Sequence, residues 1–141
     1  MKITIATGEK VSVELGGLVF EVLRRDVGDD GGHSIEIYGA DDRNTQVLRF
    51  DVFRRDPHYH MPPSAKGQLS LSDVGDPLEW AFEQTRENLP EMIRRAGFDA
   101  LADAVDRDAL RAGWTALRDA VRNAKDPTES KEFDVDPALL K

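Results

Sequence analysis

Polar and apolar side chains alternate with a period of two residues through most of the first half of the chain, which is the pattern of half-buried β-strands. In the clearest run, residues 45–53, one face carries Leu48, Phe50 and Val52, and the other carries Arg49, Asp51 and Phe53. Further predicted strands are residues 10–15, 18–25, 33–38 and 58–61. The alternation predicts an antiparallel four- or five-stranded sheet with one face free to pack on a core.

The second half of the chain has the apolar spacing of three and four residues that is typical of helices packed on a core. Asp76 is the predicted N-cap, Pro77 occupies the first helical position, and Glu79 completes a capping box. Because the apolar spacing stays in phase through Pro90, we predict one helix from about Pro77 to Ala96 that is kinked at Pro90.

Two further helices are predicted after Gly97, a short one from Asp99 through Val105 and a last one that starts near Asp106 or Asp108. The last helix carries a narrow apolar stripe formed by Leu110, Trp114, Leu117 and Val121. Such a stripe either covers the sheet or forms the seam of a homodimer. The strands and helices together predict an α+β fold, in which two or three C-terminal helices pack on one face of the antiparallel sheet.

A chain of 141 residues is long enough for one domain with a single core. We predict a single α+β domain at residues 1–124 and a polar C-terminal tail at residues 125–141. The composition of the tail, KDPTESKEFDVDPALLK, is typical of a loop or a disordered segment. Phe133, Leu139 and Leu140 are the tail residues expected to attach it to the domain or to a second copy.

The composition narrows the classes of function. The net charge is −8, and an acidic chain of this kind lacks the basic face that grips nucleic-acid backbones. The chain has no cysteine, which excludes a disulfide framework, a cysteine nucleophile and a cysteine metal site. No apolar run is long enough for a signal peptide or a membrane span. We therefore expect a cytoplasmic protein that binds a protein partner or a small ligand, and no membrane or nucleic acid.

The stretch FRRDPHYH at residues 53–60 contains the best candidate for chemistry. Residues two apart in a strand share a face, so His58 and His60 point the same way. If Arg54–Pro57 is a four-residue hairpin loop, Phe53 lies opposite His58 and Asp51 lies opposite His60. The same face then carries the predicted polar patch, which consists of Arg49, Asp51, His58 and His60. His33 is expected to be an ordinary exposed residue at a strand start.

Three interpretations of this patch compete. Two imidazoles and the Asp51 carboxylate are the ligand types of Zn²⁺ or non-heme Fe²⁺, so a divalent metal site is one hypothesis. General acid–base chemistry is the second, with one histidine as base, the other as acid, and Arg49 holding an anion. The third is a structural His–Asp pair on a wet face of the sheet. We also expect ionised Asp51 to raise the pKa of His60. No nucleotide-binding glycine loop and no EF-hand spacing is present, so no other cofactor is predicted.

The run Leu48–Asp51 (LRFD), followed by a short turn and Asp56–His60 (DPHYH), resembles the motif of a family of small bacterial proteins of unknown function. The stretch LPEMIRRAGFDALA at residues 89–102 is similar to the same family, and the resemblance covers residues 2 to about 123. This resemblance implies a fold and no activity. A looser similarity to toxin–antitoxin-associated domains motivates the alternative function, a small metal- or histidine-dependent enzyme that hydrolyses phosphodiesters.

Overall fold

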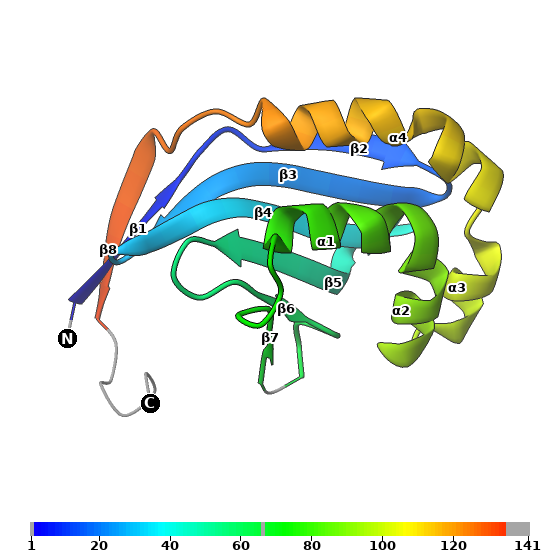
Figure 1. Cartoon of the computed structure of the whole chain (residues 1–141), viewed down its shortest axis with the longest axis horizontal. Coiled ribbons are helices and arrows are strands. Elements are labelled where there is room, and N and C mark those ends of the chain that lie inside the picture. The colour runs from blue at the N-terminus through cyan, green and yellow to red at the C-terminus, as the bar shows by residue number, and fades with distance from the viewer. Residues whose placement is uncertain (1, 66, 135–141) are drawn as a thin grey trace.

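The computed structural model describes residues 2–65 and 67–134, and within them the chain forms one antiparallel sheet of eight strands covered by helices on one face (Figure 1). The strand order is β7-β6-β5-β4-β3-β1-β8, and β2 pairs with β3 beside this path. The strands are β1 (Lys2–Thr7), β2 (Val11–Leu15), β3 (Leu18–Val27), β4 (Asp30–Gly39), β5 (Asp42–Phe53), β6 (His58–His60), β7 (Leu69–Ser70) and β8 (Glu129–Asp134). The predicted α+β class is confirmed, although the sheet has more strands than predicted.

The long central strands β3, β4 and β5 supply the sheet side of the core. Alternate residues of each strand are buried against the helices, as the period of two requires. The fully buried side chains on this face include Leu18, Phe20, Val22, Ile35, Ile37, Leu48 and Phe50. The other face of the sheet therefore receives the intervening residues, and these are mostly polar.

The helical half begins where the sequence predicts. Asp76 caps the first helix, and its Oδ1 accepts the backbone N–H of Glu79 at 3.1 Å. The helices are α1 (Pro77–Glu83), the π-helical turn η1 (Gln84–Asn88), α2 (Leu89–Arg95), α3 (Asp99–Ala104) and α4 (Arg107–Arg122). Helical backbone thus continues from Pro77 to Arg95, and Figure 1 shows α2 turned away from the direction of α1. The wide turn η1 lies just before Pro90, which has no N–H to donate to the preceding turn.

Helix α4 covers the sheet with its apolar stripe. The stripe residues are all buried, namely Leu110, Trp114, Leu117 and Val121. The Trp114 and Phe82 rings meet edge to face at a centroid distance of 5.5 Å. A Cβ added at Gly113 would lie 2.3 Å from Leu15 Cδ1, so this glycine allows α4 to approach β2 closely. The stripe packs into the core of its own chain, so it covers the sheet, which is the first of its two predicted roles. Association of two copies stays a prediction.

The C-terminal segment departs from the expected loop, because Glu129–Asp134 forms β8 and pairs with all of β1. All six residues of β8 are exposed, so the strand shows no apolar alternation that a sequence pattern could detect. The prediction of a loop is therefore wrong for this stretch, whereas Leu139 and Leu140 lie outside the described residues. Among the residues that the structure describes, no helix is long and apolar enough to cross a membrane.

Candidate functional site

The hairpin of β5 and β6 carries the predicted polar patch, but its register differs from the prediction by two residues. The opposed pairs are Arg49–His60, Phe50–Tyr59 and Asp51–His58. The expectation that Asp51 lies directly opposite His60 is therefore wrong. Arg54–Pro57 links the strands as predicted, yet Val52 and Phe53 pair only with β4. Pairing of β5 with β6 therefore starts at Asp51, two residues farther from the loop than predicted. A shift of two residues leaves every side chain on its predicted face.

Asp30, at the start of β4, fixes the loop between β5 and β6. Its carboxylate accepts the backbone N–H groups of Arg55 at 2.8 Å and Asp56 at 3.0 Å. Burial would raise the pKa of Asp30, but these N–H groups and that of Gly31 outweigh burial and lower it. The loop is thus held by an ionised carboxylate two strands away from the histidines, and sequence analysis did not identify this contact.

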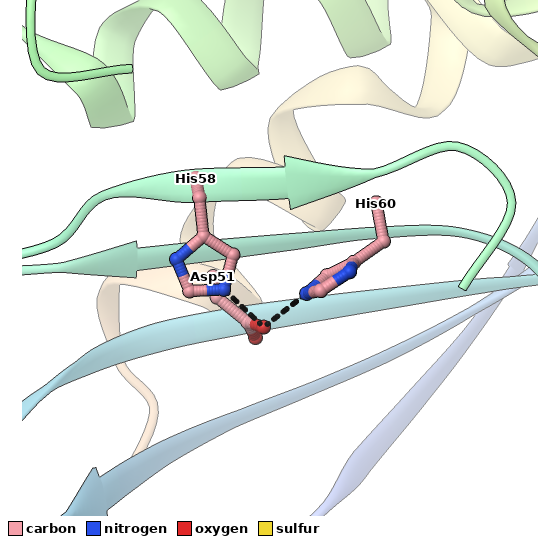
Figure 2. A group of neighbouring side chains, drawn as sticks. All are labelled: Asp51, His58 and His60. Carbon is pink, nitrogen blue, oxygen red and sulfur yellow. Dashed lines mark ion pairs between the residues drawn. The ribbon is translucent and has the colours of Figure 1, made fainter. Parts of the chain in front are cut away.

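Asp51 is the centre of the candidate site, and both imidazoles point toward its carboxylate (Figure 2). Its Oδ2 lies 3.2 Å from His58 Nε2 and 3.5 Å from His60 Nε2. The same oxygen accepts Arg49 Nε–H at 3.0 Å. The other oxygen, Oδ1, accepts the hydroxyl of Ser34 at 2.8 Å. The structure therefore brings together all the residues of the predicted patch and adds Ser34 to them.

The site is buried even though it lies on the face of the sheet that the helices leave uncovered. Asp51 is 1% exposed and His58 is 7% exposed. The His58 and Phe53 rings meet edge to face at 5.6 Å between centroids, and the Arg25 guanidinium lies over the Phe53 ring at 5.9 Å. The His58 and His60 rings meet edge to face at 5.0 Å. Side chains of this one face thus cover the Asp51 carboxylate.

The charges around Asp51 shift the pKa values of the site in different directions. Burial alone would raise the pKa of Asp51, but the hydrogen bond from His58 and the charges of Arg49 and Arg25 hold it well below its ordinary value. For His58, burial opposes the charged form, yet Asp51 and the Asp56 carbonyl raise its pKa. Burial and the charge of Arg49 lower the pKa of His60. The expected rise therefore occurs at His58, and the prediction for His60 is wrong.

The orientation of the His58 ring restricts its chemistry. Its Nδ1 lies 2.7 Å from the carbonyl oxygen of Asp56, which can only accept a hydrogen bond, so Nδ1 carries a hydrogen. In a neutral imidazole the other nitrogen, Nε2, then has a lone pair directed at Asp51 Oδ2, which is also an acceptor. A cation is required between these two atoms, either a second proton on His58 or a metal ion.

A second polar row crosses the same face beside Asp51. Glu36 on β4 lies opposite Arg49 and is 6% exposed. Its Oε1 lies 3.0 Å from Lys10 Nζ and accepts the hydroxyl of Tyr38 at 3.2 Å. Arg49 therefore stands between the Glu36 row and the Asp51 site, and the two buried carboxylates, Glu36 and Asp51, each have a cationic partner.

His33, the remaining histidine, takes no part in the site. It pairs with Val52 and Arg24 on the face that the helices cover, and it is half-buried, not exposed as expected. Burial and the neighbouring charge of Arg24 lower its pKa. The sequence did contain a signal for Ser34, since this polar residue alternates with the apolar Ile35 in a strand next to β5.

Comparison with known proteins identifies a domain family whose function is unknown. A domain of unknown function (DUF7700) matches residues 12–121. This match spans β2 through α4 and includes all the residues of the candidate site. No curated protein and no solved structure matches the chain. An uncharacterised domain family, as the resemblance implied, is confirmed, whereas the bacterial origin of the motif stays a prediction.

Proposed function

Because the chain belongs to the DUF7700 family, a domain family of unknown function, we propose from the site alone that it is a ligand-binding module for a divalent metal ion. The ligands are Asp51 Oδ2, His58 Nε2 and His60 Nε2. The observation that carries the proposal is the His58 ring, whose Nδ1–H is engaged by the Asp56 carbonyl while Nε2 faces a carboxylate oxygen. Metal-ligating histidines typically donate their second N–H to a backbone carbonyl or a carboxylate in this way.

The spacing of the three atoms supports the same proposal. They lie within 4.8 Å of one another. In a tetrahedral site with bonds of about 2.0–2.1 Å, ligand atoms are about 3.3 Å apart. The distances from Asp51 Oδ2 to the two histidine nitrogens, 3.2 and 3.5 Å, are close to that value.

The donor set favours transition metals over Mg²⁺ or Ca²⁺. Two imidazole nitrogens and one carboxylate suit Zn²⁺ or Fe²⁺, whereas Mg²⁺ and Ca²⁺ prefer oxygen ligands. Three protein ligands leave further coordination positions for water or a substrate. The proposal includes a cytoplasmic location, which we expect from the composition. It also includes recognition of a protein partner by the metal-bound module.

Metal content is the direct test. Protein purified without a histidine tag and dialysed should hold about one zinc or iron ion per chain in elemental analysis. The His58→Ala/His60→Ala double variant should be empty, and added Zn²⁺ should raise the melting temperature of wild type but not that of this double variant. His33→Ala is the matched control, because it removes the histidine of the other face and should keep the ion. Wild type that is empty and shows no zinc- or iron-dependent thermal shift would refute the proposal.

A second candidate function is metal-assisted hydrolysis of phosphodiesters, the enzymatic alternative expected from the sequence. Arg25 and Arg49 favour it, because two guanidinium groups near the carboxylate suit an oxyanion. Arg49 Nε lies 3.0 Å from Asp51 Oδ2, and the Arg25 charge acts on the same carboxyl. Arg25 Nε is buried and has no hydrogen-bond partner among the described residues. Hydrolysis would add one water across the P–O bond and give a phosphomonoester and an alcohol.

Bis(p-nitrophenyl) phosphate tests this candidate through the absorbance of released nitrophenolate. Zinc-loaded wild type should release it, and Arg49→Met and the double histidine variant should lose the activity. His33→Ala should retain it. Zinc-loaded protein that leaves both this ester and a short RNA intact would exclude the enzyme and leave the binding module standing.

A further inference from the structure

A cavity of about 550 Å³ opens at the turn between β4 and β5, away from the Asp51 site. The turn Gly39–Asp42 forms one wall and the segment Gly97–Ala104, which includes α3, forms the other. Val47 lies at its floor. Sites for small molecules commonly enclose about 300–1,000 Å³, so the cavity has the size of a ligand site. None of its lining residues belongs to the candidate metal site.

An irregularity in the sheet builds the floor of this cavity. Ile37 pairs with Leu48, but the next residue, Tyr38, pairs with Gln46, so Val47 has no partner on β4. The bulge turns Val47 toward the core, where it is 2% exposed and packs with the buried apolar residues. Bulges of this kind re-aim side chains and occur often beside binding sites.

Two glycines, Gly17 and Gly39, line the cavity without adding a side chain to its walls. A Cβ added at Gly39 would lie 3.1 Å from Leu101 Cδ1 and 3.0 Å from Asp41 Oδ1, so only a hydrogen leaves this approach open. Gly17 adopts φ +85°, a conformation that other residues rarely take, and its added Cβ would face the Ala104 carbonyl at 3.6 Å. The interior surface that results is mostly apolar.

The charge of the lining has one sign. Asp41, Asp42 and Asp99 line the cavity, and no lysine, arginine or histidine does so among the described residues. Arg94 partly offsets Asp99, since its Nη1 lies 3.7 Å from Asp99 Oδ1. Asp41 and Asp42 are exposed at the mouth, where their negative charge faces the opening. An apolar floor with a negative rim is complementary to a ligand with an apolar body and a positively charged end.

We propose that this cavity is a second binding site, which takes a small organic cation such as an amine with an aromatic or branched aliphatic body. The body occupies the space over Val47 and Leu101, and the ammonium group lies at the rim beside Asp41 and Asp42. An organic acid of the same shape is excluded by the same carboxylates. The site is independent of the metal proposal, because the two sites share no residue.

Three probes with the same phenyl body and different charge test the proposal: phenethylamine, 2-phenylethanol and 3-phenylpropionate. Each is titrated into the full ¹⁵N-labelled chain and followed by amide chemical shifts. Phenethylamine should give saturable shifts at Gly39, Gly97 and Ala104. The affinity of the neutral alcohol should be lower by a factor of about five or more, because each exposed ion pair contributes up to about a fivefold change in affinity. The carboxylate should cause no saturable shift at these amides.

Variants then locate the contacts. Asp41→Asn/Asp42→Asn should reduce phenethylamine affinity to that of the alcohol, whereas Asp73→Asn, which removes one carboxylate at an exposed loop residue outside the cavity, should not. Ala100→Trp places a large side chain at the mouth from an exposed helix position and should abolish binding without unfolding the chain. Equal binding of amine and alcohol, unchanged binding in the double aspartate variant, saturable shifts elsewhere, or no saturable shift with any probe would each overturn the proposal.

Discussion

Replacing Ser34 by alanine removes one hydrogen bond at the centre of the candidate site. Ser34 is 0% exposed, and its hydroxyl donates to Asp51 Oδ1 at 2.8 Å, which leaves Oδ2 facing the two histidines. A hydrogen bond to a charged group contributes about 1.5–3 kcal/mol, so the free energy of unfolding should fall by that amount. For a domain of this size the melting temperature should fall by about 5–10 °C. If Asp51 is a metal ligand, zinc affinity should fall by about 10- to 100-fold, because Ser34 orients the ligating carboxylate.

Ser12→Ala is the matched control for this prediction. The Ser12 hydroxyl also donates to a carboxylate on the neighbouring strand, that of Glu21, but this pair is exposed. Its loss should cost less than about 1 kcal/mol and should not change zinc affinity. Urea unfolding of both metal-free variants and calorimetric titration with Zn²⁺ measure the two effects. Ser34→Ala that matches Ser12→Ala in stability and zinc affinity would refute the central role given to the Ser34–Asp51 contact.

Three further predictions concern the pH dependence, the core and the C-terminal strand. In metal-free protein, NMR titration should give His58 a pKa above and His60 a pKa below the ordinary histidine value, and Asp51→Asn should lower that of His58. The Asp51–His58 pair should stabilise the fold most between about pH 4 and 6.5. At lower pH its contribution is lost as the Asp51 carboxylate, whose pKa is lowered, takes up a proton. At higher pH the contribution is lost as His58, whose pKa is raised, releases its proton. Trp114→Ala should cost about 3–5 kcal/mol in chemical unfolding, since a buried aromatic ring leaves a cavity, and a cost below about 1 kcal/mol would contradict its place in the core. Deletion of residues 125–141 should reduce hydrogen-exchange protection in Lys2–Thr7, which loses its β8 partner and keeps only the pairing of Ile5–Thr7 with β3. Protection of the central strands should persist if residues 1–124 form the domain.

The faces of the strands could be predicted from the sequence, because side-chain parity depends only on the position along a strand. Leu48 and Phe50 on one face and Asp51 on the other follow from the period of two. The grouping of Asp51 with His58 and His60 survived an error of two residues in the register for the same reason, since an even shift preserves the face.

The remaining features depend on contacts that local patterns do not encode. The carboxylate of Asp30 organises a loop that begins 24 residues later, at Arg54, and nothing in either segment reveals the contact. Strand β8 is held by backbone hydrogen bonds to β1 while its side chains stay exposed, so no apolar period marks it. The direction of the His60 pKa shift depends on the burial of the ring and on the charge of Arg49, and both follow from the three-dimensional arrangement.

The absorption spectrum of Co²⁺ tests the metal site most directly, because Co²⁺ replaces zinc at such sites and its visible bands report the coordinating atoms. Addition of about one equivalent to metal-free wild type and to His33→Ala should produce the intense visible bands of a protein-bound ion with nitrogen and oxygen ligands. The His58→Ala/His60→Ala variant should show only the weak spectrum of hydrated Co²⁺. A wild-type spectrum that equals that of the hydrated ion would contradict the assignment of Asp51, His58 and His60 as metal ligands.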